Sequence, residues 1–153
     1  MLINHELKSC FDFTESQKMQ TIGREVKISL PNQRLYNLDA KVDTGAYHSA
    51  IHCHEVQKKL IDGKTVLSVR FLDPEHPAYH EKELIFEKFK KTIVTSSFGN
   101  KQQRYIIKLK VKINDKIYIA NFTLANRSRL KYPILLGRTL LRGNFLVDPS
   151  RKQ

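Results

Sequence analysis

The chain has 153 residues, of which 41% are hydrophobic and 27% are charged. This length and composition predict one globular domain with its own core, and they exclude a disordered or fibrous chain. Lysine and arginine outnumber aspartate and glutamate by 27 to 15, and the resulting net charge of +12 indicates an acidic partner. The basic residues are spread along the whole chain without a nucleic-acid-binding motif, so nucleic acid is not the expected partner.

Neither a membrane span nor a secretory signal is visible in the sequence. No apolar run approaches the roughly 20 residues that a membrane helix needs, and the start lacks a basic stretch followed by an apolar one. These features predict a cytoplasmic protein that makes no membrane contact. Cys10 and Cys53 are interpreted as free thiols, because their spacing does not indicate a disulfide bond.

The first half of the chain contains one clear hairpin. Residues 1–21 show no sustained period and are predicted to form an N-terminal arm, followed by a single domain over residues 22–153. Apolar and polar residues alternate from 26 to 42 on both sides of a turn at 31–34. This pattern is typical of two antiparallel strands.

The middle of the chain carries weaker signals. Residues 54–60 are predicted to form one or two helical turns, ended by Asp62-Gly63. A strand is expected over residues 66–72, and residues 84–95 mix strand and helix features and are interpreted as a strand. The middle segment is therefore the least defined part of the predicted domain.

The second half contains another hairpin and a short helix. Residues 104–113 and 116–124 alternate apolar side chains with lysines and other polar residues. Asn114-Asp115 supplies the two-residue turn, since both residue types tolerate positive φ. A brief helix is expected over residues 138–142. The overall prediction is an all-β domain with one short C-terminal helix.

Asp43, Thr44 and Gly45 are the first candidate functional residues, and they directly follow an alternating strand. Two carboxylates that share one proton can activate water toward an amide, because one removes a proton from water while the other donates to the carbonyl oxygen. The Thr44 hydroxyl can orient the loop, and Gly45 permits a close backbone approach. Such residues also serve plain turns, so this motif alone leaves both interpretations open.

A second motif, near the C-terminus, supports the catalytic interpretation of the first. An apolar strand, Ile134-Leu135-Leu136, runs into Gly137-Arg138 and the short helix. Together with Asp43-Thr44-Gly45-Ala46, this segment resembles the retropepsin-like aspartic proteases. The chain is also similar to a bacterial subfamily of these proteins that is also labelled "ATP-dependent zinc protease". The segments that carry this similarity are GREVKISLP, AKVDTGA, TLANRS, YPILLGRTLL and FLVDPS.

The resemblance implies a closed all-β barrel and an aspartic endopeptidase that acts as a homodimer. Because the chain holds a single Asp-Thr-Gly, each subunit would contribute Asp43 to one dyad. Gly137 and Arg138 would support the loop from beneath. Tyr47 stands where viral relatives carry an acidic residue that pairs with this arginine, so Arg138 needs another partner.

The resemblance also implies the residues that contact substrate. A β-hairpin flap would lie over the cleft, and residues 96–100 fit its tip, with an ordinary surface turn as the alternative. The residues expected to bind substrate lie before the loop, within it, at the flap tip and in the apolar strand. They are Lys41, Ala46, Phe98, Gly99 and Leu136.

Lys41 connects the site to the net charge. Residues two apart on a strand face the same way, so Lys41 is expected to point with Asp43 toward the cleft. An ammonium there favours a carboxylate-bearing substrate, which predicts acidic, Glu-rich peptides such as an ATP-grasp glutamate ligase system would produce. In the alternative, Lys41 lies solvated at the rim.

The sequence also contains potential metal ligands close together. His48, His52, Cys53 and His54 offer four potential ligands in seven positions, but the sequence has no His-Glu-x-x-His and no phosphate-binding loop. Ordinary histidines are the favoured interpretation, and no metal or other cofactor is predicted. Two alternatives to the endopeptidase stay open: a non-catalytic peptide-binding module of the same fold, and a zinc-dependent hydrolase that uses the His48–His54 cluster.

Overall fold

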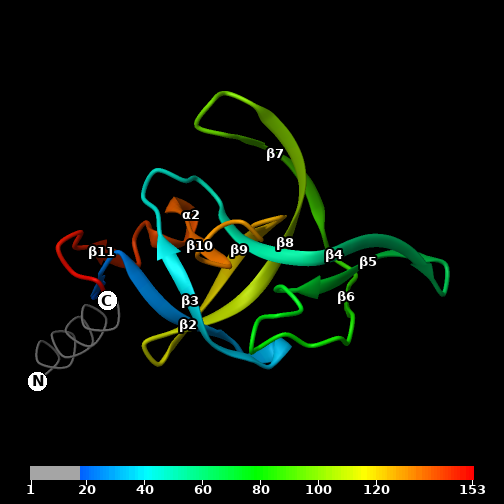
Figure 1. Cartoon of the computed structure of the whole chain (residues 1–153), viewed down its shortest axis with the longest axis horizontal. Coiled ribbons are helices and arrows are strands. Elements are labelled where there is room, and N and C mark those ends of the chain that lie inside the picture. Colours follow the sequence, from blue (N-terminus) through cyan, green and yellow to red (C-terminus); the bar gives the residue numbers. More distant parts are fainter. Residues whose placement is uncertain (1–17) are drawn as a thin grey trace, which may run out of the picture.

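A computed structural model describes residues 18–153, and most of its regular elements are strands (Figure 1). The predicted arm over residues 1–21 lies largely outside the described residues, and the first strand begins at Gln20. Within residues 18–153 there is one short α-helix, near the C-terminus, which agrees with the predicted fold class. The elements are β1 (Gln20–Ile22), β2 (Glu25–Leu30), the 3-10 turn η1 (Pro31–Gln33), β3 (Leu35–Val42), β4 (Ser49–Ile61), β5 (Lys64–Phe71), β6 (Leu84–Phe86), β7 (Lys90–Thr95), β8 (Lys101–Ile113), β9 (Lys116–Ala125), β10 (Ile134–Leu136), α2 (Arg138–Leu141) and β11 (Phe145–Val147).

The main sheet closes on itself. Its strand order is β10-β3-β2-β8-β9-β4-β5-β6, and an additional pairing of β10 with β4 joins the two ends of the β10-to-β4 stretch into a ring. Strand β7 pairs with β8, and β1 pairs with β11 in a separate two-stranded parallel sheet. Closure of this kind removes exposed edges from the ringed strands.

The core lies inside this ring and follows the alternation seen in the sequence. On β8, the even-numbered lysines from 108 to 112 are exposed while the odd-numbered apolar residues are buried. One inward face of alternating residues per strand is what a half-buried sheet requires. The largest fully buried side chains are Phe122, Ile22, Ile28, Leu30, Leu38, Ile51, Leu67, Leu72, Ile107, Ile113, Ile134 and Leu136.

Both predicted hairpins are confirmed. Strands β2 and β3 pair antiparallel with Ile28 opposite Leu38, and β8 and β9 pair from Ile113 opposite Lys116. Asn114 and Asp115 have φ of 48° and 67°, the left-handed conformation expected of this turn. The predicted single strand over 84–95 is two strands instead, β6 and β7.

The predicted helical turns over residues 54–60 are wrong, because this segment belongs to β4. It pairs antiparallel with β5, with Val56 opposite Val69 and Lys58 opposite Leu67. Asp62 and Gly63 have φ of 50° and 76°, so they form the turn of a long hairpin rather than the end of a helix. Pairing with the next strand, rather than the segment's own periodicity, decided its structure.

No helix within residues 18–153 has both the length and the apolar character needed to cross a membrane.

Candidate active site

The Asp43 loop is positioned by the strand that passes beneath it. Strand β10 lies between β3 and β4, parallel to the first and antiparallel to the second. The Asp43 N–H donates to the Leu136 carbonyl oxygen at 2.9 Å, and the Arg138 N–H donates to the Ala46 carbonyl oxygen at 2.8 Å. The loop is thus held at both its start and its middle by backbone hydrogen bonds to β10 and α2.

Gly137 marks the closest crossing of the two segments. A Cβ at this position would lie 2.5 Å from the carbonyl oxygen of His48 and 3.0 Å from that of Ala46, both backbone atoms. The Gly137 N–H donates to the Ser49 hydroxyl at 3.0 Å in a buried setting. Only glycine fits here, because any side chain would separate β10 from the loop.

The Asp43 carboxylate is partly exposed at the end of β3 and is fixed by its own loop. The Gly45 N–H donates to Asp43 Oδ1 at 2.9 Å. A Cβ on Gly45 would lie 3.2 Å from the same oxygen, which is a tight contact. The second glycine of the site therefore serves the close approach of a backbone donor to the carboxylate.

Arg138 has a partner other than an acidic side chain. Its Nη1 donates to the Thr44 carbonyl oxygen at 3.1 Å, and its guanidinium lies 5.8 Å from the centroid of the Tyr47 ring. A hydrogen bond and a cation–π contact thus hold the arginine against the loop. Tyr47 contributes the aromatic face in this arrangement.

A cleft of about 390 Å³ separates the loop from the β7–β8 hairpin. The hairpin rises beyond the rest of the molecule at the top of Figure 1, on the side where the loop after β3 lies. Its tip, residues 96–100, is closed by the Ser96 hydroxyl, which accepts a hydrogen bond from the Asn100 N–H at 3.1 Å. The cleft is lined by Gly45, Ala46, Tyr47, His48, Ala50, Ile93, Val94, Thr95, Arg104, Thr123, Arg127, Leu135 and Arg138.

Only some of the residues expected to bind substrate line the cleft. Ala46 lines the cleft, but Leu136 is fully buried in the core, and its neighbour Leu135 faces the cleft instead. Lys41 is exposed and is not among the residues that line the cleft. Phe98 is 92% exposed at the hairpin tip, where Gly99 has a φ of 83°. The lower part of the hairpin, rather than its tip, forms the wall of the cleft.

Arg104 and Arg127 also line the cleft, and no local pattern in the sequence predicted either of them. Arg104 comes from β8 and Arg127 from the loop after β9. Partial burial lowers the pKa of the Arg127 guanidinium and the charge of Arg104 lowers it further, whereas the charge of Asp43 raises it. Arg127 therefore lies close enough to interact with both Arg104 and Asp43.

Of the histidine cluster, His52 takes part in structural hydrogen bonds. His52 is buried, its Nδ1 accepts a hydrogen bond from the Arg127 N–H at 2.7 Å, and its Nε2 lies 2.9 Å from Asp73 Oδ1. Because Nδ1 is an acceptor, the ring proton lies on Nε2 and is donated to the carboxylate. Burial raises the pKa of the Cys53 thiol. Within residues 18–153 no three His, Cys, Asp or Glu side chains gather as a metal site would require.

The ring of strands, the Asp-Thr-Gly loop above a glycine crossing and the hairpin beside the cleft define the class of retropepsin-like aspartic protease domains. Residues 21–153 match the family described as "RimB-like: Retropepsin-like aspartic endopeptidase RimB", and the chain belongs to this family. The resemblance noted in the sequence is thereby confirmed.

The chain is also similar to curated proteins and to a solved structure. "Probable alpha-L-glutamate ligase" proteins of Desulfotalea psychrophila and Shewanella pealeana are each 29% identical over 133 residues, or 84% of this chain. The chain spans only 28% of the length of these relatives. Lpg0085 from Legionella pneumophila, a crystal structure of unknown function, matches with a TM-score of 0.69 and 27% identity over 88% of this chain and 96% of that one.

Proposed function

We propose that this protein is an aspartic endopeptidase whose dyad consists of Asp43 from each of two identical subunits. One carboxylate takes a proton from water, while the protonated partner donates to the carbonyl oxygen of the scissile amide. The tetrahedral intermediate then collapses as a proton passes to the amide nitrogen and the C–N bond breaks. The rigid attachment of the Asp43 loop to β10 and α2 supports this proposal, because a dyad requires a fixed carboxylate.

The positive charge of the cleft supports a proposal about the preferred substrate. Arg104, Arg127 and Arg138 all line it, and within residues 18–153 no Asp or Glu is among its lining residues. Arginine forks match carboxylates in a bidentate geometry. A peptide with several glutamates is therefore the preferred substrate. The name of the curated relatives, probable alpha-L-glutamate ligases, fits a partner system that adds such residues.

The catalytic proposal is tested with Asp43→Asn. We expect this variant to stay dimeric in sedimentation analysis and to lose at least about a thousandfold in cleavage of a Glu-rich peptide followed by mass spectrometry. Unchanged cleavage, or full activity in a monomer, contradicts the dyad. Peptide binding by the parent without cleavage favours the non-catalytic module, and loss of parent activity on addition of a chelator favours the zinc hydrolase.

The specificity proposal is tested with Arg104→Gln and Arg127→Gln, and with Arg129→Gln as a matched control outside the cleft wall. Each protein is given two peptides that differ only in glutamate or glutamine. We expect the glutamate preference in kcat/KM to fall about tenfold in each cleft variant, and to weaken as salt rises. An equal preference in all four proteins contradicts a role for the arginines.

Lys41→Leu tests whether Lys41, rather than the cleft arginines, sets the preference for glutamate. Lys41 is exposed and outside the cleft wall, so its replacement is expected to leave the glutamate preference unchanged. A loss of preference as large as that of Arg127→Gln would move the specificity back to Lys41.

A further inference from the structure

A second cavity lies at the opposite end of β3 from the Asp43 loop. Its volume is about 420 Å³, within the range of small-ligand sites. Strand β3 has eight residues, which at about 3.3 Å each place the cavity roughly 25 Å from the cleft. It shares no residue with the cleft wall and is lined by Asn32, Gln33, Arg34, Leu35, Phe71, His80, Lys82 and Leu84.

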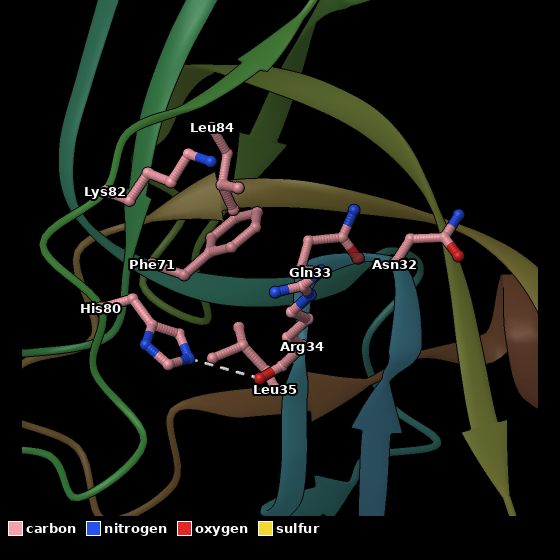
Figure 2. Close-up of a pocket in the computed structure, with 8 residues that line it drawn as sticks. All are labelled: Asn32, Gln33, Arg34, Leu35, Phe71, His80, Lys82 and Leu84. Atoms are coloured by element: carbon pink, nitrogen blue, oxygen red, sulfur yellow. Dashed lines mark hydrogen bonds between the residues drawn. The ribbon is translucent and has the colours of Figure 1, made fainter.

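The floor of this cavity is apolar. Leu35 and Phe71 belong to the core, with 2% and 3% of their surface exposed, and Leu84 packs against the core from β6. Figure 2 shows the Phe71 ring between Leu84 and Leu35, with His80 on one side and Gln33 on the other. A ligand here contacts an aromatic face and two aliphatic side chains.

The rim carries positive charge without a counter-charge. Arg34 and Lys82 make no ion pair with any residue in the 18–153 range. The adjacent carboxylate of Glu83 is already engaged, because Lys59 Nζ donates to its Oε2 at 2.7 Å and the Ser68 hydroxyl donates to the same oxygen at 2.5 Å. The two cations are thus available to an anionic ligand.

A polar group in the wall also lacks a partner. The Oε1 atom of Gln33 is buried and accepts no hydrogen bond from the described residues. The turn that carries it is held in place, because His80 Nε2 donates to the Arg34 carbonyl oxygen at 3.3 Å. A buried amide oxygen without a donor costs free energy, and a ligand N–H recovers it when the Gln33 side chain turns this oxygen toward the cavity.

We propose that this cavity binds the C-terminus of a peptide whose last residue is apolar. The terminal carboxylate accepts from Arg34 and Lys82, the last amide N–H donates to Gln33 Oε1, and the last side chain packs on Phe71. An apolar body, one anion and one N–H donor are the three features that the cavity matches. The site lies outside the cleft and requires no cleavage, so it goes beyond the proposed peptidase activity.

The proposal is tested by calorimetric titration with short peptides. We expect acetyl-Gly-Gly-Leu with a free carboxylate to bind at least about tenfold more tightly than its C-terminal amide, and than acetyl-Gly-Gly-Ser with a free carboxylate. Hexanoate, which has the apolar body and the anion but no amide, distinguishes a peptide site from a general fatty-anion site. Tighter binding of hexanoate than of the leucine peptide, equal binding of acid and amide, or no binding at all overturns the proposal.

Variants locate the binding. Arg34 has a φ of 56°, so Arg34→Asn removes the charge with a residue that tolerates this conformation. We expect Arg34→Asn and Lys82→Gln each to weaken the leucine peptide about tenfold, and Lys88→Gln, an exposed lysine outside the cavity, to leave it unchanged. Unchanged binding in both cavity variants overturns the assignment.

Amide chemical shifts supply a second readout. The leucine peptide is expected to shift resonances of residues 32–35 and 80–84 and to leave those of the Asp43 loop in place. The reverse pattern places the peptide in the cleft and overturns the proposal, whatever the outcome for cleavage.

Discussion

The Asp43 loop and the β7–β8 hairpin face each other across one cleft, yet they are held in opposite ways. Backbone hydrogen bonds to Leu136 and Arg138 anchor the loop to the core. Within the described residues β7 pairs only with β8, and the hairpin leaves Ile93 64% and Phe98 92% exposed. The loop after β3 thus forms a fixed wall of the cleft, and the hairpin forms a second wall stabilised mainly by its own ladder.

This difference suits the two tasks of a hydrolytic cleft. A carboxylate must keep its position for chemistry, and the loop's attachment to buried strands achieves this. A covering hairpin must admit and release a peptide, which a segment with few buried contacts can do at low cost. The following substitutions test the contrast.

Gly137→Val is expected to have the largest effect. Its Cβ meets the His48 backbone at 2.5 Å, so the variant must move the loop or β10 and is expected to lose about 3 kcal/mol or more of stability. Thermal and urea unfolding measure this loss. Gly143→Asn is the control, because nothing lies within 4 Å of a Cβ there and asparagine tolerates its φ of 78°. Equal stability of the two variants would mean that the crossing is not tight.

A matched pair of serines compares the two walls directly. The Ser49 hydroxyl accepts from the buried Gly137 N–H, whereas the Ser96 hydroxyl accepts from the exposed Asn100 N–H. We expect Ser49→Ala to cost about 1–3 kcal/mol, because a buried donor is left unpaired, and Ser96→Ala to cost about 0.5 kcal/mol or less, because water replaces the hydroxyl. Urea unfolding of both variants checks this. Similar losses would remove the distinction between the walls.

Phe98→Ser tests the hairpin by activity rather than by stability. The exposed ring contributes little to folding, so the free energy of unfolding is expected to change by less than about 0.5 kcal/mol. If the tip closes over substrate, KM for a Glu-rich peptide rises by about threefold to tenfold. Ile117→Ser, an exposed apolar residue on β9 outside the cleft wall, is the control. Equal KM values for the two variants would make the tip an ordinary turn.

Glu25→Gln is expected to have the smallest effect and to depend on pH. The Tyr132 hydroxyl donates to Glu25 and, with the charge of Lys152, holds the pKa of this carboxyl below its usual range. Its stabilisation is therefore present above the ordinary carboxyl range and is lost as the pH falls through the lowered pKa. Urea midpoints between about pH 6 and about pH 3 should fall more steeply in the parent than in the variant. Asp115→Asn, at a fully exposed turn, is the control. Parallel curves for parent and variant would contradict this contribution.

The sequence by itself predicted several features that rest on local pattern. Alternation and turn residues identified the β2–β3 and β8–β9 hairpins, and the resemblance carried by the Asp43 and Gly137 motifs identified the loop and the strand beneath it. These predictions succeeded because a strand with one buried face must alternate, and because a tight crossing leaves glycine as the only choice.

The remaining features depended on which segments pair and pack together. Residues 54–60 are a strand because β5 pairs with them across the Asp62-Gly63 turn, and their own period did not reveal this. Leu135 rather than Leu136 faces the cleft, and a run of apolar residues does not show which of two neighbours points outward. Arg104 and Arg127 come from separate elements, and only the tertiary fold brings both to the cleft beside the Asp43 loop. Local sequence specifies a strand's period, whereas the choice of its partners and the charges that gather around a site are set by packing across the whole fold.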